Sequence, residues 1–157
     1  MKRSSAVLGG LLLAGAIFAA DQSAKRYTEK QKGVFPEGKL YRKNPVFLLQ
    51  KSHNPGAFLR LGNRKPSLIA AISVFMTVLT GLMLLFSFGN AGNGLLRTGL
   101  SALFGGAFSN TYDRLQKKYV VDYISFKFGP EAFRRIVFNL ADFAILAGSV
   151  LILLGTD

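Results

Sequence analysis

The sequence contains no cysteine, a single histidine, and only eight acidic residues among 157. Without cysteine, disulfides, thiolate catalysis and cysteine-based metal sites are excluded. Because His53 is the only histidine, a two-histidine zinc site is impossible, and a Ser-His-Asp triad would have to use it. We expect His53 to be an exposed loop residue. The hydrolytic chemistries that remain are a carboxylate pair or a serine with a lysine.

Positive charge is abundant by contrast. The chain has 20 Lys and Arg residues and a formal net charge of +12, although half of its residues are hydrophobic. The cations avoid four long apolar stretches and collect between them, which is typical of a membrane protein. A soluble protein that binds nucleic acid would spread its cations over a folded surface. We therefore expect membrane lipid around the chain and no nucleic-acid partner.

The apolar stretches predict an all-α membrane protein, a single domain over residues 1–157 with four transmembrane helices. The spans cover approximately residues 5–25, 67–88, 94–112 and 136–154. The first stretch also has features of a secretory signal peptide, since its apolar core is short and follows Lys2 and Arg3. Because three later spans already commit the chain to the membrane, we interpret it as a retained helix.

Glycines recur inside the spans, and small residues there usually permit close contact between helices in lipid. We predict this packing role for Gly81, Gly99, Gly105, Gly106 and Gly148.

Two long polar segments join the spans. Residues 26–66 are predicted to form a small extracytoplasmic β-rich domain, with strands at Lys39–Tyr41 and Pro45–Leu49 and a short interfacial helix at Asn54–Leu61. Residues 114–135 form a second extracytoplasmic loop. Because the number of spans is even, both loops lie on the side opposite the termini.

The charge distribution favours the opposite orientation. Apart from Lys2, Arg3 and Arg97, all of the 20 cations belong to the loop side. The positive-inside rule alone would therefore place the loops in the cytoplasm. The motifs described below favour loops outside the cell.

Two aspartates are candidates for catalysis. Asp142 lies within the fourth span, where a carboxylate is expensive and usually functional, and Asn139 shares its helical face. Asp122 is flanked by apolar residues at a membrane boundary, and the loop between the third and fourth spans allows it to meet Asp142. Two adjacent carboxylates share a proton near neutral pH. The ionised member can then activate water while the protonated member polarises a scissile carbonyl.

Other interpretations remain open from the residues alone. Asp113 with Arg114, or Asp142 with a loop cation, could form buried ion pairs that stabilise the bundle. A non-enzymatic small membrane transporter or assembly factor could use such carboxylates to relay protons. Ser23 and Lys25 could attempt serine-lysine catalysis, although a lysine at a helix end is more often a snorkelling anchor. The Gly-x-Gly-Asp arrangement of presenilin-like proteases is not found.

Five ordered motifs resemble those of lipoprotein signal peptidase, also called signal peptidase II, and span nearly the whole chain. They are Asp21–Lys25, Asn54–Phe58, Asn110–Arg114, Val121–Tyr123 and Phe138–Asp142. Two positions depart from the family's pattern. A single Ala57 separates Gly56 from Phe58 where the family commonly has two alanines, and Ser109 stands where glycine is usual.

The resemblance implies an aspartic endopeptidase of the bacterial cytoplasmic membrane, with both termini cytoplasmic and the active site facing outward. Its catalytic pair matches Asp122 and Asp142. Residues that support the pair or the substrate match Asp21, Lys25, Asn54, Gly56, Asn110, Arg114 and Asn139. Asp113 is interpreted as structural.

The substrate that the resemblance implies is a diacylglyceryl prolipoprotein, cleaved just before its lipidated cysteine. The resemblance also implies inhibition by globomycin-type cyclic peptides. Neither a metal nor a cofactor is expected.

Overall fold

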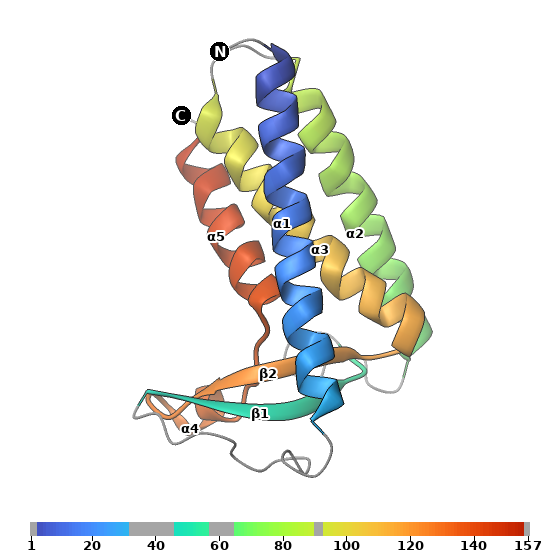
Figure 1. The fold of residues 1–157 in the computed structure, drawn as a ribbon, viewed down its shortest axis with the longest axis vertical. Coiled ribbons are helices and arrows are strands. Elements are labelled where there is room, and N and C mark those ends of the chain that lie inside the picture. The colour runs from blue at the N-terminus through green and yellow to red at the C-terminus, as the bar shows by residue number, and fades with distance from the viewer. Residues whose placement is uncertain (1–2, 32–45, 57–64, 90–92, 156–157) are drawn as a thin grey trace.

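The computed structural model describes residues 3–31, 46–56, 65–89 and 93–155. Within these ranges the chain forms five helices and two strands. They are α1 (Arg3–Lys30), β1 (Phe47–Asn54), α2 (Pro66–Ser87), α3 (Gly94–Lys117), β2 (Val120–Phe126), α4 (Glu131–Arg134) and α5 (Leu140–Leu154). The long helices lie side by side, while β1, β2 and α4 gather at the end away from both termini (Figure 1).

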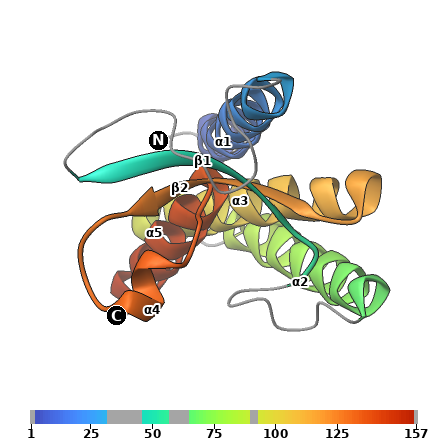
Figure 2. The ribbon, with the colours of Figure 1, turned by 90° about the horizontal axis from the view of Figure 1, so that it is seen from below.

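Helix α3 is the centre of the bundle and packs against α1, α2 and α5, as the view along the helices shows (Figure 2). Glycines allow this close approach. A Cβ on Gly99 would lie 2.7 Å from the carbonyl oxygen of Gly148 in α5, and one on Gly105 would lie 2.7 Å from that of Ala14 in α1. The predicted packing role is therefore confirmed at these contacts.

The outward faces of the helices are apolar. Phe75 and Phe86 of α2 and Leu153 of α5 are each more than 60% exposed. Among the described residues, the helices at Ser4–Lys30 and Pro66–Ser87 are long and apolar enough to cross a membrane, and Leu140–Leu154 is a shorter apolar helix. A mostly helical protein with such faces and a small sheet at one end has the architecture of a membrane protein.

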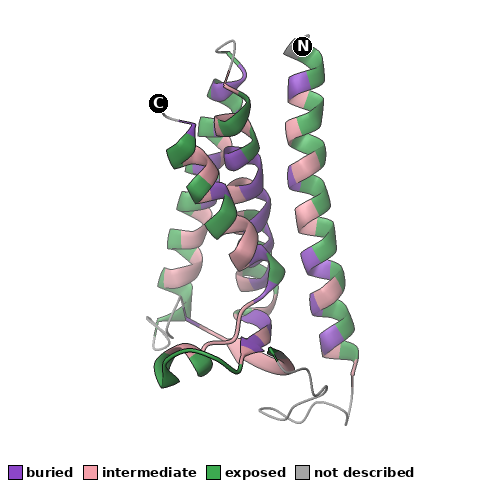
Figure 3. Cartoon of the chain, turned by 90° about the vertical axis from the view of Figure 1, so that its left-hand side faces the viewer, coloured by how far each residue is buried: buried purple, intermediate pink, exposed green. Residues whose placement is uncertain are grey.

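The interior changes character along the bundle. Near the termini, Leu84, Phe88 and Leu100 form a buried apolar cluster. At the opposite end the buried side chains are largely polar, and Figure 3 shows buried residues continuing along α1 and α3 to this end. Burying polar groups costs free energy unless they are hydrogen-bonded. Because so many are buried at this end, we look for the functional site there.

The two strands pair antiparallel and lie across the ends of the helices (Figure 2). Asn54 lies opposite Val120 and Ser52 opposite Asp122, with a register irregularity between Leu49 and Ser52. The sheet therefore joins the two loops, whereas the sequence predicted strands in the first loop alone. The predicted strand at Lys39–Tyr41 lies outside the described residues.

Other boundaries also differ from the predictions. Helix α1 continues to Lys30, and α5 begins at Leu140. Asn54 ends a strand where an interfacial helix was predicted to begin, and most of that predicted helix lies outside the described residues. The prediction for His53 was wrong, because it lies in β1, partly buried, with its ring centroid 4.2 Å from that of Tyr119.

Candidate active site

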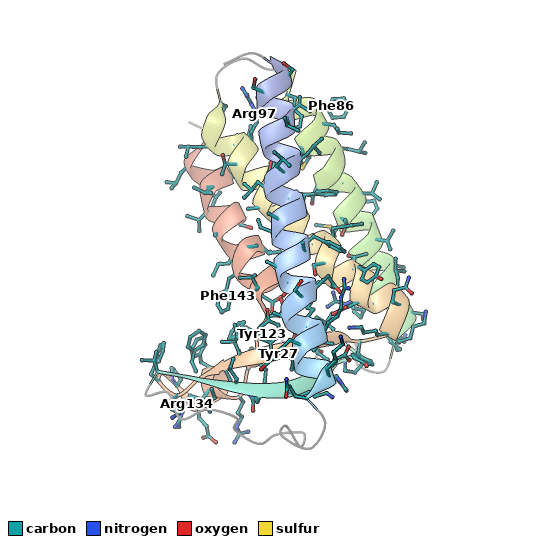
Figure 4. All side chains as sticks on the ribbon, in the orientation of Figure 1. Tyr27, Phe86, Arg97, Tyr123, Arg134 and Phe143 are labelled. Atoms are coloured by element: carbon teal, nitrogen blue, oxygen red, sulfur yellow. The ribbon has the colours of Figure 1, made fainter. Side chains whose placement is uncertain are left out.

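Asp122 and Asp142 are brought together from two different elements. Asp122 is buried in β2, directly before the buried Tyr123, and Asp142 lies in the first turn of α5. Figure 4 shows Tyr123 where α1 and α5 approach β2, which locates this junction. The return of the chain from α4 to α5 places the start of α5 beside β2, because Tyr123 and Ile124 both donate their backbone N–H to the carbonyl of Phe138.

Asn139 contacts both carboxylates. It is the N-cap of α5, where its Oδ1 accepts from the backbone N–H of Asp142 at 2.9 Å. In return, Oδ2 of Asp142 accepts from the backbone N–H of Asn139 at 3.0 Å, which completes a capping box. The side-chain Nδ2 of Asn139 donates to Oδ1 of Asp122 at 2.7 Å. One fully buried residue therefore holds the two acids at a fixed separation.

Two further asparagines each hydrogen-bond one carboxylate. Asn54, at the end of β1, donates from Nδ2 to Oδ2 of Asp122 at 3.3 Å. Asn110, on α3, donates from Nδ2 to Oδ1 of Asp142 at 2.9 Å and accepts at Oδ1 from Nδ2 of Asn139 at 3.1 Å. Amide donors orient the two carboxylates but carry no positive charge of their own. Either acid can therefore still bind a proton.

The electrostatic setting favours a bound proton. Burial and, after it, the nearby carboxylate of Asp142 raise the pKa of Asp122 to about 7, although hydrogen bonds from Asn139 and Asn54 oppose the rise. Asp122 can therefore hold a proton near neutral pH. An acid whose pKa lies near the working pH is suited to general acid-base chemistry.

A fully buried ionic cluster lies behind Asn110. The ammonium of Lys25 contacts Asp21 at 2.7 Å and Asp113 at 3.1 Å, and it donates to Oδ1 of Asn110 at 2.8 Å. The snorkelling interpretation of Lys25 was wrong, since its side chain has no exposure at all. Asp113 also pairs with Lys117 at 3.2 Å, in keeping with a structural role.

Serine-lysine catalysis does not fit this arrangement. The hydroxyl of Ser23 is exposed and donates to the backbone carbonyl of Ala19 at 2.6 Å, in its own helix. Lys25 is buried among its acidic partners. Within the ranges 3–31, 46–56, 65–89 and 93–155, no three His, Cys, Asp or Glu residues are grouped so that they could hold a metal ion.

Arg114 and Gly56 meet at the edge of the site. The guanidinium Nη2 of Arg114 donates to the carbonyl of Gly56 at 3.0 Å, and Nη1 donates to the carbonyl of Asn110 at 3.4 Å. The backbone N–H of Gly56 donates to Oδ1 of Asn54 at 3.1 Å. Arg114 therefore ties the segment after β1 to α3, beside the amide that contacts Asp122.

A cavity of about 790 Å³ opens from the two acids and lies between α2 and α5. Apart from Asp122, Asp142 and a few polar side chains, its walls are apolar. One wall belongs to a group of phenylalanines whose ring centroids lie 5.3 to 6.1 Å apart, comprising Phe126, Phe133, Phe138 and Phe143 in the cavity wall together with Phe128. Figure 4 shows Phe143 on α5, near the end of the helix that faces the sheet.

The structure also reveals contributors that the sequence analysis missed. Tyr123 donates its hydroxyl to Oδ1 of Asp21 at 3.1 Å, and Gln22 donates from Nε2 to Oγ of Ser109 at 2.9 Å. Glu29 pairs with Lys117 at 2.8 Å. Ser109 was noted only as a departure from the family's pattern, and Tyr123 only as part of the Val121–Tyr123 motif. For Ser109 and Tyr123 the available signal was a polar group beside or within an apolar run.

A helical membrane fold with two neighbouring carboxylates, one buried and one partly buried, at the head of an apolar cavity defines the class of membrane aspartic peptidases. Comparison with known proteins agrees. The family model described as "Signal peptidase (SPase) II" matches residues 13–156. The chain therefore belongs to the signal peptidase II family.

Individual relatives carry the name lipoprotein signal peptidase. The chain is 32% identical over 142 residues to the lipoprotein signal peptidase of Moorella thermoacetica, covering 90% of this chain and 88% of that protein. It is 31% identical over 156 residues to that of Staphylococcus carnosus, covering 98% and 93%. These matches favour the peptidase over the transporter or assembly factor.

Solved structures share the fold. A bacterial membrane enzyme matches with a TM-score of 0.78 at 23% identity, covering 93% of this chain and 85% of that chain. A second structure, also described as a bacterial membrane enzyme, matches with a TM-score of 0.75 at 24% identity, covering 93% and 90%.

Proposed function

We propose that this chain is an aspartic endopeptidase of the bacterial cytoplasmic membrane that removes signal peptides from diacylglyceryl prolipoproteins, cleaving before the lipidated cysteine. The observation that carries the proposal is the contact of Asp122 and Asp142 with one residue, Asn139, at the head of an apolar cavity. The substrate class is supported by the family and by the name that its members carry, lipoprotein signal peptidase.

In the reaction, the pair holds one proton, and we assign it to Asp122 because its pKa is about 7. Ionised Asp142 takes a proton from water as the water oxygen attacks the scissile carbonyl carbon, while Asp122 donates its proton to the carbonyl oxygen. The tetrahedral intermediate then breaks its C–N bond. The leaving amine takes the proton from Asp142, and Asp122 regains its own from the intermediate.

Asparagine amides give this pair its geometry. Asn54 and Asn139 orient Asp122, and Asn110 orients Asp142 through the contacts described above. Their contribution is preorganisation, because donors already in place do not have to reorganise during the reaction.

A second group of residues supports the pair indirectly. Lys25, which pairs with Asp21, donates to the amide oxygen of Asn110, while Arg114 donates to the backbone carbonyl of Gly56 next to Asn54. We assign Asp113 a structural role, because it balances the charge of Lys25 within the buried cluster.

We infer that α1, α2, α3 and α5 all cross the membrane, with the strands and the dyad at its outer surface and both termini in the cytoplasm. The apolar outward faces of the bundle support this arrangement. A site at the water-lipid boundary gives a hydrolase access to water while its substrate stays anchored in lipid.

The cavity between α2 and α5 fits the proposed substrate. A signal peptide and two acyl chains are apolar, and all of them extend from the scissile bond into the membrane. An apolar cavity beside the acids can receive such groups directly from the bilayer. We expect globomycin-type cyclic peptides to compete for the same cavity.

The test is cleavage of a purified diacylglyceryl prolipoprotein by detergent-solubilised protein. Asp122→Asn and Asp142→Asn should each lower the rate about a thousandfold or more while the thermal unfolding transition is retained. Glu131→Gln, which changes an exposed acid of α4, is the matched control and should cleave normally. A folded Asp122→Asn or Asp142→Asn variant with near-normal cleavage would contradict the proposal, as would cleavage that is indifferent to the diacylglyceryl group.

A further inference from the structure

Asp21 lies at the start of a buried chain of contacts that leads to the candidate dyad. Its Oδ2 contacts the ammonium of Lys25 at 2.7 Å and accepts the hydroxyl of Ser109 at 2.7 Å. Its Oδ1 accepts the hydroxyl of Tyr123 at 3.1 Å. Asp21, Lys25 and Ser109 have no exposure, and Tyr123 is 7% exposed. A carboxylate removed from water in this way depends on such donors for its position.

The hydroxyl of Ser109 is directed towards Asp21 by a third residue. Gln22 donates from Nε2 to Oγ of Ser109 at 2.9 Å, so the serine oxygen accepts there and its own proton is free to point at the carboxylate. A glycine at this position would leave the same oxygen of Asp21 with Lys25 alone.

Tyr123 acts at two places at once. It donates to Asp21, and its oxygen accepts the backbone N–H of Leu140 at 3.1 Å. Leu140 is the first residue of α5, and the first N–H groups of a helix have no partner within the helix. Tyr123 therefore fixes the position of the helix end that carries Asn139 and Asp142.

From Asp21 the contacts continue to Asp142. Lys25 donates to Oδ1 of Asn110 at 2.8 Å, and that oxygen also accepts from Asn139. With its oxygen held by two donors, the amide of Asn110 can only present its nitrogen to Asp142, at 2.9 Å. Loss of a donor at Asp21 would allow Lys25 to shift and would release this amide.

We infer that Ser109 and Tyr123 are positioning residues for the catalytic pair. They act through Asp21 and Lys25 on the amide of Asn110, and Tyr123 also acts on the first turn of α5. The inference rests on the proposed function, because it assigns these hydroxyls a part in the same reaction. Neither residue touches a carboxylate of the dyad, so their loss should slow the chemical step and leave substrate binding unchanged.

The experiment compares single hydroxyl deletions. In detergent, Ser109→Ala and Tyr123→Phe should each lower kcat about tenfold with KM changed less than about twofold, because small displacements of reacting groups affect the chemical step. Since both act on Asp21, the double variant should lose less than the product of the two single losses.

Matched controls remove hydroxyls that do not reach Asp21. Ser101 is a fully buried serine of the same helix, and its hydroxyl bonds to the carbonyl of Arg97. Ser101→Ala and Tyr112→Phe should keep kcat and KM. Thermal unfolding of every variant separates effects on stability from effects on kcat.

Each outcome decides the inference. A lower unfolding temperature with an unchanged kcat would show a purely structural role and overturn it, and so would a raised KM at normal kcat. If one of the two variants fails to fold, the kcat of the other decides. Failure of the proposed function is recognised separately, by cleavage that persists in Asp122→Asn and Asp142→Asn.

Discussion

At the scale of single residues, Asn139 begins α5 and contacts both candidate catalytic carboxylates. The same capping box that starts the helix holds Asp142, while the remaining amide hydrogens point to Asp122 and Asn110. The spacing of Asn139 and Asp142 predicted a shared helical face, whereas Asn139 precedes the helix as its N-cap, with extended backbone, and the two residues meet through the capping box. The sequence did not reveal the cap, because a hydropathy pattern indicates where a span lies and not which side chain bonds the free N–H groups of its first turn.

Replacement of Asn139 should affect activity far more than stability. Asn139→Ala removes the side-chain donor to Asp122 and the acceptor for the backbone N–H of Asp142, and we expect cleavage to fall about a hundredfold. The loss of an N-cap should lower the free energy of unfolding by about 1–2 kcal/mol. The kcat of the purified variant and its thermal melt measure the two effects.

Asn93 offers a matched control at the other end of the bundle. It caps α3 in the same way, accepting from the backbone N–H of Leu96 at 2.9 Å, and it also donates to the carbonyl of Gly155. Asn93→Ala should lower stability comparably with no loss of kcat. Equal losses of kcat in the two variants would mean that Asn139 acts only as a cap.

Lys25 shows why the roles of side chains were harder to predict than the order of the helices. A lysine at the end of an apolar stretch usually extends to the membrane surface, yet Lys25 turns inward because Asp21 and Asp113 compensate its charge. These acids come from α1 and α3. Asp21 precedes Lys25 by four residues in the same helix, so the sequence contains that pairing, whereas the pairing with Asp113 depends on the packing of α1 against α3, which no local pattern contains.

At the scale of elements, the order of the long helices was predictable and their ends were not. Helix α3 was expected to stop near Tyr112 but continues to Lys117. The additional turn is polar, and Asp113 and Lys117 within it form buried or partly buried ion pairs. A hydropathy pattern predicts that a span ends where charged residues begin. The helix itself can continue when those charged side chains have partners.

Contact between α3 and α5 depends on backbone approach at Gly99. In Gly99→Ala, the new Cβ would meet Gly148 O at 2.7 Å and Ile152 N at 2.8 Å, so one helix must move. We expect the free energy of unfolding to fall by about 1–3 kcal/mol, as for other overpacked contacts. Denaturation of the purified variant in detergent measures the change.

Gly94 provides the control for this substitution. It is the first residue of α3, and an added Cβ there meets no atom within 4 Å. Gly94→Ala should therefore be neutral. Close packing at Gly99 would be refuted if the two alanine variants were equally stable.

At the scale of the whole molecule, the charge distribution and the proposed orientation point in opposite directions. Part of the conflict is local, because several loop-side cations already have acidic partners. Lys25 pairs with Asp21, Lys117 with Glu29 and Arg135 with Glu131. Because these cations are paired with acids, the net positive charge on the loop side is lower than a count of Lys and Arg suggests.

Single cysteines can establish the orientation, because the chain has none of its own. Arg134, exposed on α4, lies at the strand end of the bundle in Figure 4. Helix α3, whose first residue is Gly94, begins at the end with the termini (Figure 1). An impermeant maleimide added to intact cells should label Arg134→Cys and spare Gly94→Cys. The reverse pattern would place the site in the cytoplasm.

The pH dependence of kcat tests most directly whether the two acids share a proton. The pair is active when one acid is ionised and the other protonated, so kcat should rise as the first proton leaves and fall as the second leaves. Because the pKa of Asp122 is about 7, the falling limb should begin near neutral pH, and Asp122→Asn should abolish activity across the whole range. A kcat that stays constant or still rises at about pH 9, where both acids would be ionised, would contradict the account.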